Sequence, residues 1–106
     1  MADPTPKETL LVLVKQSLAI VSTATARDTE LLALINAGIQ DLERQGIAVD
    51  TQLDNDLINA TIIMFVKANF GMVDDRQKEY ARKTYYLLCQ NLGLSGDYLE
   101  SELTND

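Results

Sequence analysis

The run from Asp56 to Gly71, DLINATIIMFVKANFG, limits the possible folds of this chain more than any other feature. On a helical wheel at 3.6 residues per turn, its apolar residues occupy every side, so no wide polar stripe remains. A helix that is apolar all round has to be covered all round, by other helices, by a second subunit or by both. The run is shorter than the roughly 20 residues that cross a membrane, and Lys67 interrupts it. We therefore predict a central helix over about residues 56–70, wrapped by the rest of the chain.

The composition suits one small helical domain that does not bind nucleic acid. The chain has 106 residues, 46% of them hydrophobic, and both prolines precede residue 7. Sixteen acidic against nine basic residues give a formal charge of −7, which opposes adhesion to DNA or to anionic membranes. The single cysteine excludes an intramolecular disulfide, and the amino-terminal stretch has no secretory pattern, so we expect synthesis in a cytoplasm.

A first helix is predicted from Pro6 to about Gln16 or Leu18, because Thr5, Pro6 and Glu8 form a helix start. Its leucines and Val14 make one apolar face, whereas Val12 falls on the opposite side beside Lys15. Val12 is either a lone exposed valine or a contact with another subunit. Residues 18–26 have no helical stripe, which indicates a loop.

A second helix is predicted from Asp28, as its N-cap, to Gln45, with Gly46 in the left-handed position that follows a helix. Gly38 interrupts its apolar face and suggests that another helix approaches closely there, although a merely tolerated glycine also fits.

The next connection contains the acid-rich run DTQLDND at residues 50–56, which superficially resembles a calcium-binding loop. The position that requires glycine holds Asn55 and the position that requires glutamate holds Thr61, so we reject a calcium site. Asp54 or Asn55 is instead expected to cap the central helix.

A fourth helix is predicted from a cap at Asp74 or Asp75 to a stop at Gly93. Its pattern predicts that Tyr86 points away from the core, either as an anchor for a partner or as a ring lying over its own helix. The expected core face contains Tyr80, Ala81, Thr84, Tyr85, Leu87, Leu88 and Leu92. Residues 94–106 carry four acids and no base, which indicates a frayed acidic tail.

The fold class that these segments predict is all-α: a small bundle of four main helices around the central apolar helix. We expect a single domain over residues 1–106, with an ordered core at about 6–93 and the tail at 94–106.

Catalytic signals are missing from the sequence. There is no histidine, which removes the commonest general base and the commonest transition-metal ligand, and one cysteine cannot make a zinc site. Neither a glycine-rich phosphate loop nor a Gly-x-Ser-x-Gly elbow occurs. Cys89, between leucines and without a histidine partner, is expected to be a small buried or half-buried hydrophobe. We therefore expect no enzyme, no cofactor and no metal.

Three segments carry a resemblance to a known family: residues 28–42 (DTELLALINAGIQDL), residues 56–71, and residues 83–93 (KTYYLLCQNLG). Over roughly residues 7–98 the chain resembles the small head-tail connector, or adaptor, proteins of tailed bacteriophages and prophages, often labelled DNA-packaging proteins. The resemblance implies a virion protein, made in the bacterial host cytoplasm, that forms a homo-oligomeric ring of about 12 copies at the head-tail junction. Such a ring would lie under the portal protein, extend the DNA channel and offer a docking surface to tail-completion proteins. The alternative is a small helical adaptor or regulatory module that binds one protein partner as a monomer or dimer.

Two groups of candidate residues follow. Between Asp28 and Asp56 there are seven acids and only one base, Arg44, so a surface formed there would repel DNA and keep it mobile in a channel. The candidate channel-facing acids are Asp41, Glu43 and Asp50. The candidate contacts with other subunits or partners are Val12, Lys67, Arg82, Lys83 and Tyr86, although the bases around the fourth helix also fit a solvated face with ion pairs along the helix.

Overall fold

The computed structural model describes residues 6–49 and 55–95, and these residues form four α-helices. In chain order the helices are α1 (Pro6–Ser17), α2 (Asp28–Arg44), α3 (Asp56–Asn69) and α4 (Asp75–Ser95). The predicted all-α class is confirmed. The proposed cap Thr5, the acids Asp50 and Asp54, and most of the predicted tail lie outside the described residues.

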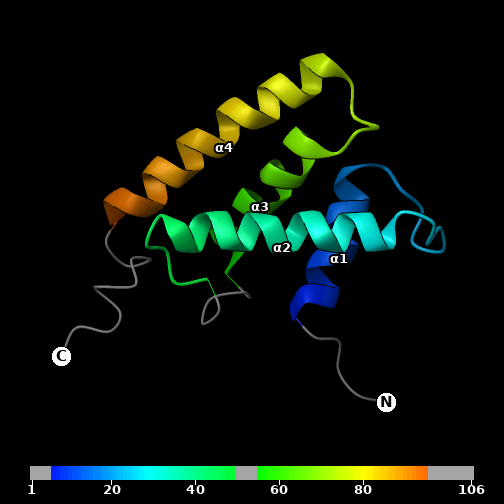
Figure 1. Cartoon of the computed structure of the whole chain (residues 1–106), viewed down its shortest axis with the longest axis horizontal. Helices are drawn as coiled ribbons and strands as arrows, with labels where there is room; N and C mark the ends of the chain where they lie inside the picture. The colour runs from blue at the N-terminus through cyan, green and yellow to red at the C-terminus, as the bar shows by residue number, and fades with distance from the viewer. Residues whose placement is uncertain (1–5, 50–54, 96–106) are drawn as a thin grey trace.

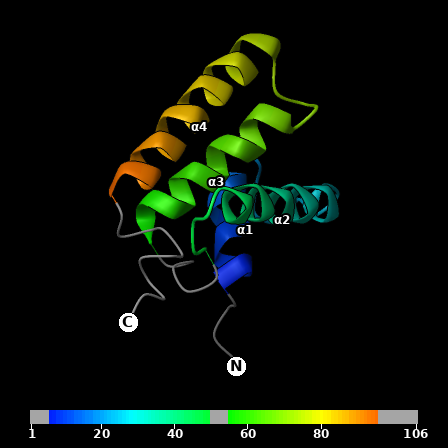
Figure 2. The same ribbon diagram turned by 60° about the vertical axis from the view of Figure 1, so that its left-hand side comes forward.

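Helix α3 lies between α4 on one side and the pair of α1 and α2 on the other, as two views of the ribbon show (Figures 1 and 2). It contacts each of the other three helices. Helix α4 runs back alongside α3, and α2 crosses both at a steep angle. The core that these contacts enclose consists of Leu10, Val14, Leu31, Ile35, Ile39, Leu42, Ile47, Val49, Ile58, Ile62, Val66, Phe70, Tyr85, Cys89 and Leu92.

Several helix ends follow the local rules that the sequence suggested. Asn55 caps α3, since its side-chain oxygen accepts hydrogen bonds from the backbone N–H groups of Leu57 at 2.9 Å and Ile58 at 3.2 Å. The carboxylate of Asp74 accepts the backbone N–H of Gln77 at 2.8 Å and so caps α4. Gly46 follows α2 with a φ of +87°, the left-handed conformation that glycine adopts at least cost.

The prediction that Asp28 caps α2 is wrong. Arg27 occupies the N-cap position and makes no side-chain capping bond there. The carboxylate of Asp28 instead lies 2.9 Å from the Lys15 ammonium, whose Nζ also donates to the backbone oxygen of Ser22 at 3.1 Å. The placement of Lys15 on a polar outer face is wrong for the same reason: only 4% of the residue is exposed, because the ion pair compensates its charge. This pair ties α1 to the start of α2.

Helix α4 continues two residues past the predicted stop at Gly93 and ends at Ser95. Gly93 is therefore a helix residue, and it does not have a positive φ. Among the helices of the described residues, none is long and apolar enough to cross a membrane.

Candidate functional site

Helix α4 has two apolar faces, of which one packs inward. Ala81, Tyr85, Cys89 and Leu92 are buried, as expected for a helix lying along α3. The prediction that Cys89 is a buried or half-buried hydrophobe is confirmed, since 8% of it is exposed.

The second apolar face of α4 is exposed. Tyr80, Leu87 and Leu94 are 70%, 61% and 85% exposed, and they recur at intervals of seven residues. This spacing places them in one row along the helix, which we call the outer stripe of α4. The assignment of Tyr80 and Leu87 to the core face was wrong, because the row at 81, 85, 89 and 92 already fills the groove against α3. Exposed rows of large apolar residues are typical of surfaces that bind another protein.

Charged residues of α4 pair with one another. Arg82 lies 2.7 Å from Glu79, and Lys83 lies 4.0 Å from the same carboxylate. All three side chains are at least half exposed, so each pair contributes only about 0.2–1 kcal/mol. Tyr86 is 60% exposed, in agreement with its predicted outward direction. These ion pairs do not cover the outer stripe, whose three residues stay more than 60% exposed.

A polar cluster joins α2 to the inner side of α4. The hydroxyl of Tyr85 donates a hydrogen bond to the carboxylate of Asp41, and Arg44 and Gln45 contact the same carboxylate at 2.6 Å and 3.1 Å. Burial, and next the bond to Asp41, raise the pKa of Tyr85 well above its usual value. Burial likewise raises the pKa of the Cys89 thiol. Both groups are protonated at neutral pH, so the cluster holds helices together and supplies no nucleophile.

The same region confirms the predicted close approach at Gly38. A Cβ built on Gly38 would lie 3.0 Å from Cδ1 of Phe65, which means that the α3 ring packs directly on the α2 backbone. That ring meets Tyr85 edge to face, with centroids 5.4 Å apart. Gly38 thus lets α2, α3 and α4 meet at one point.

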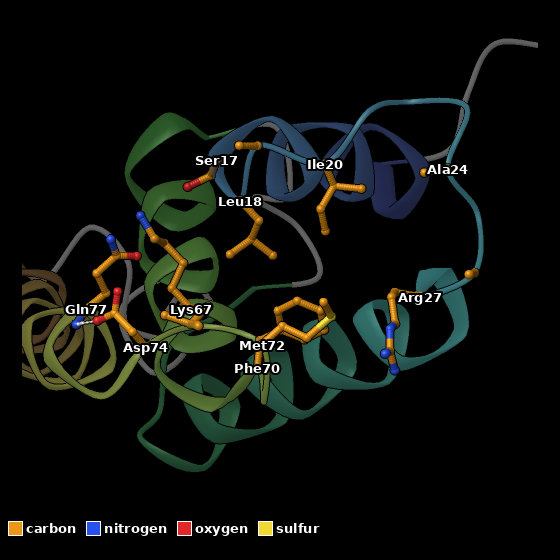
Figure 3. Close-up of a pocket in the computed structure, with 13 residues that line it drawn as sticks. Ser17, Leu18, Ile20, Ala24, Arg27, Lys67, Phe70, Met72, Asp74 and Gln77 are labelled. Carbon is orange, nitrogen blue, oxygen red and sulfur yellow. Dashed lines mark hydrogen bonds between the residues drawn. The ribbon is translucent and has the colours of Figure 1, made fainter.

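A cavity of about 740 Å³ lies at the other end of the molecule, where the α1–α2 loop meets the α3–α4 turn (Figure 3). We call it the loop cavity. Leu18 and Ile20 project into it from the first loop, and Phe70 and Met72 lie across from them. Lys67 contributes its ammonium from the last turn of α3. The described residues that line it are Ser17, Leu18, Ala19, Ile20, Ala24, Ala26, Arg27, Lys67, Phe70, Met72, Val73, Asp74 and Gln77.

The structure brings only some of the candidate contact residues together. Arg82, Tyr86 and Asp41 line a smaller cavity of about 330 Å³ between α2, α3 and α4. Val12 is 47% exposed and lines a separate cavity of about 280 Å³ beside α1. Lys67 lies apart from both, in the loop cavity.

The candidate channel acids differ in how much of them reaches solvent. Asp41 is engaged in the cluster described above, and its side chain is 27% exposed. Glu43 lies near the end of α2 and is half-buried, with further contacts of its own. Asp50 lies outside the described residues. Asp41 therefore combines a structural role with partial exposure.

Sequence reasoning did not find the loop cavity. Its two walls, at residues 17–27 and 67–77, are about 40 residues apart in the chain, so no local pattern joins them. The only signal was the presence of two apolar residues, Ile20 and Met72, in segments that the pattern predicts as loops. In the described segments, 6–49 and 55–95, no group of three or more cysteine and acidic side chains is placed to hold a metal ion.

Comparison with known proteins identifies one family. The family described as phage connector protein matches residues 10–98, which is most of the chain. The chain shows no significant match to a curated protein or to a solved structure.

Proposed function

Because the chain belongs to the phage connector protein family, whose general role is to connect the phage head with its tail, we propose that it forms a ring between the portal and the tail. In this proposal the ring extends the DNA channel below the portal protein and offers a docking surface to tail-completion proteins. About 12 copies would match the symmetry expected for such a ring. The protein would act by packing and charge, without catalysis.

The observation that carries the ring proposal is the outer stripe of α4. Tyr80, Leu87 and Leu94 are each more than 60% exposed, although one protomer has already buried the opposite face of the same helix. Burying one such side chain contributes roughly 1.5–3 kcal/mol, so a row of three is enough to matter in a subunit contact. A cyclic ring repeats one heterologous contact, in which the stripe of each copy meets a different surface of the next.

The acidic segment supplies the second part of the proposal. We place Asp41, Glu43 and Asp50 toward the bore, where their charge repels the phosphate backbone and keeps DNA mobile. Residues 28–56 carry seven acids and one base, and the chain as a whole carries −7. DNA then passes without specific binding.

Electron microscopy of the purified chain, alone and mixed with the portal protein of the same phage, tests the ring. We expect rings of about 12 copies on the portal, and the double variant Tyr80→Asp/Leu87→Asp should fail to form them. Val21→Asp is the matched control, because Val21 is 67% exposed but lies off α4. Urea unfolding verifies that the double variant is still folded. A strict monomer that never joins the portal would refute the proposal.

The channel role has its own measurement. Glu43→Lys and Asp50→Lys together should slow DNA release from assembled particles without reducing ring formation. Normal infectivity and normal DNA release in these particles would refute the placement of the acids in the bore.

A further inference from the structure

We propose that the loop cavity receives the acidic segment of residues 96–106 from a second copy of this chain. The inference rests on the proposed ring, in which each copy has a neighbour, and it names one contact by which neighbours hold each other. One copy contributes the cavity to this contact, and its neighbour contributes the segment that binds there.

The cavity has the size of a ligand pocket and an apolar lining. Its volume of about 740 Å³ lies within the range of roughly 300–1,000 Å³ that is typical of binding pockets. Its floor is apolar, and Met72 at its edge is 67% exposed in the isolated protomer. An occupant that buries Met72 would remove this apolar surface from water.

The charges at the rim favour an acidic occupant. Lys67 has no ion-pair partner among the residues that the structure describes. Within residues 6–49 and 55–95, the ion pair of Arg27 is an exposed contact of 3.6 Å with Glu30. Asp74, the one acid in the lining, is already engaged as the cap of α4. In a chain of charge −7, the cavity lining carries two bases, Lys67 and Arg27, against one acid, Asp74.

The segment GDYLESELTND at residues 96–106 has the complementary composition. It carries four acids and no base, and its apolar residues are Tyr98, Leu99 and Leu103. Tyr98 and Leu99 can fill the apolar floor while the neighbouring acids pair with Lys67 and Arg27. No other stretch outside the described residues combines large apolar side chains with this charge: residues 1–5 hold one acid, and residues 50–54 hold one leucine.

For Tyr98 and Leu99, chain length decides between the same copy and a second one. Gln77 lines the cavity near the start of α4, and α4 ends at Ser95. At 1.5 Å per residue these two positions are about 27 Å apart. Leu99 lies four residues beyond Ser95 and can reach at most about 14 Å from it. Tyr98 and Leu99 therefore cannot enter their own cavity. The segment follows one end of α4, and the cavity lies at the other end. A contact between two such different surfaces is heterologous, and repeated heterologous contacts build a ring when the rotation from copy to copy closes.

Mixing two variants of the full chain tests this contact. The segment variant is Tyr98→Ala/Leu99→Ala, and the cavity variant is Lys67→Glu/Met72→Glu. Sedimentation velocity at protein concentrations up to about 1 mM, where even weak contacts are populated, measures the association. We expect the wild type to associate, and each variant alone to associate at least tenfold more weakly.

In an equimolar mixture the two variants should form a dimer of one copy of each, since the intact segment of one meets the intact cavity of the other. The control Lys7→Glu/Thr9→Glu, at two exposed positions near the start of α1, has a matched charge change away from the cavity and should associate like the wild type. Circular dichroism verifies that all variants are helical.

The inference is overturned if the mixture stays monomeric, or if the segment variant associates as well as the wild type. These results are separate from the ring test. Rings formed on the portal by the segment variant would overturn this contact and leave the ring intact. A mixed dimer together with a wild type that never joins the portal would support this contact and refute the ring.

Discussion

The partly buried ion pair between Lys15 and Asp28 allows a quantitative test of how α1 is held to α2. We consider Asp28→Ala, which removes the carboxylate 2.9 Å from an ammonium whose side chain is only 5% exposed. Removing one partner of a fully buried pair costs about 3–5 kcal/mol, because the other charge is left without compensation. Here the cost is smaller, since the Asp28 side chain is 26% exposed and Lys15 keeps its hydrogen bond to Ser22. We expect a loss of about 2–3 kcal/mol in the free energy of unfolding.

Urea denaturation followed by circular dichroism measures this loss of free energy. In a domain of this size, the same loss should lower the melting temperature in a thermal scan by roughly 10–20 °C. The decisive comparison is the double variant Lys15→Met/Asp28→Ala. Methionine fills the space of the lysine stem without a buried charge, so the double variant should be more stable than Asp28→Ala alone. Arg27→Ala is the control, because its pair with Glu30 is 3.6 Å long and about half exposed. It should change stability by less than about 0.5 kcal/mol.

Two outcomes would refute the reasoning. If Asp28→Ala unfolds within about 0.5 kcal/mol of the wild type, Lys15 does not depend on its partner. If the double variant is less stable than Asp28→Ala, the cost arises from lost packing or helix charge and not from the unpaired ammonium.

Three further variants probe the packing, the cap and the polar cluster. Gly38→Val should destabilise the protein by about 2 kcal/mol in urea because its Cβ would lie 3.0 Å from an aromatic carbon of α3. By contrast, a Cβ at Gly93 meets no atom within 4 Å, so Gly93→Ala should raise the free energy of unfolding by roughly 0.5–1 kcal/mol. If the two variants changed the free energy of unfolding equally, the close packing at Gly38 would be contradicted. Asn55→Ala should cost about 1 kcal/mol through the lost α3 cap, and no loss would mean that the capping bonds are replaced by water. Because the folded pKa of Tyr85 is raised, its contribution is present below the unfolded pKa near 10 and is lost as pH rises above it. Tyr85→Phe should therefore make stability fall less steeply between pH 9 and 11, as urea unfolding at several pH values can measure.

Helix positions could be predicted from the sequence because their causes are local. Prolines before residue 7, the cap at Asn55 and the left-handed Gly46 act within one turn of the helix end. The boundaries of α1, α2 and α3 accordingly agree with the prediction to within one or two residues, and that of α4 is longer by two. The close approach at Gly38 could also be predicted, since a glycine inside an otherwise clean apolar face leaves room for the backbone to meet a neighbouring helix.

The errors concern contacts between distant segments. Periodicity places Lys15 on a polar face, and nothing near it in sequence announces that Asp28, on another helix, will neutralise it within the fold. The loop cavity was missed for the same reason, because its walls meet only when α1, α2 and α3 pack together. A charged side chain that is paired across two helices leaves no signal in hydrophobic periodicity.

The misassigned residues of α4 are informative about function for a physical reason. A helix against one neighbour buries a single stripe, so a second stripe of large apolar residues has no use within the protomer. Tyr80, Leu87 and Leu94 extend along about 21 Å of α4 at the helical rise of 1.5 Å per residue. A row of this length matches a helix or groove of another chain better than a point contact does. Because the inner face of α4 is held by Tyr85 and Leu92, polar substitutions on the outer stripe should weaken association while leaving unfolding unchanged, which separates the surface that binds from the surface that folds.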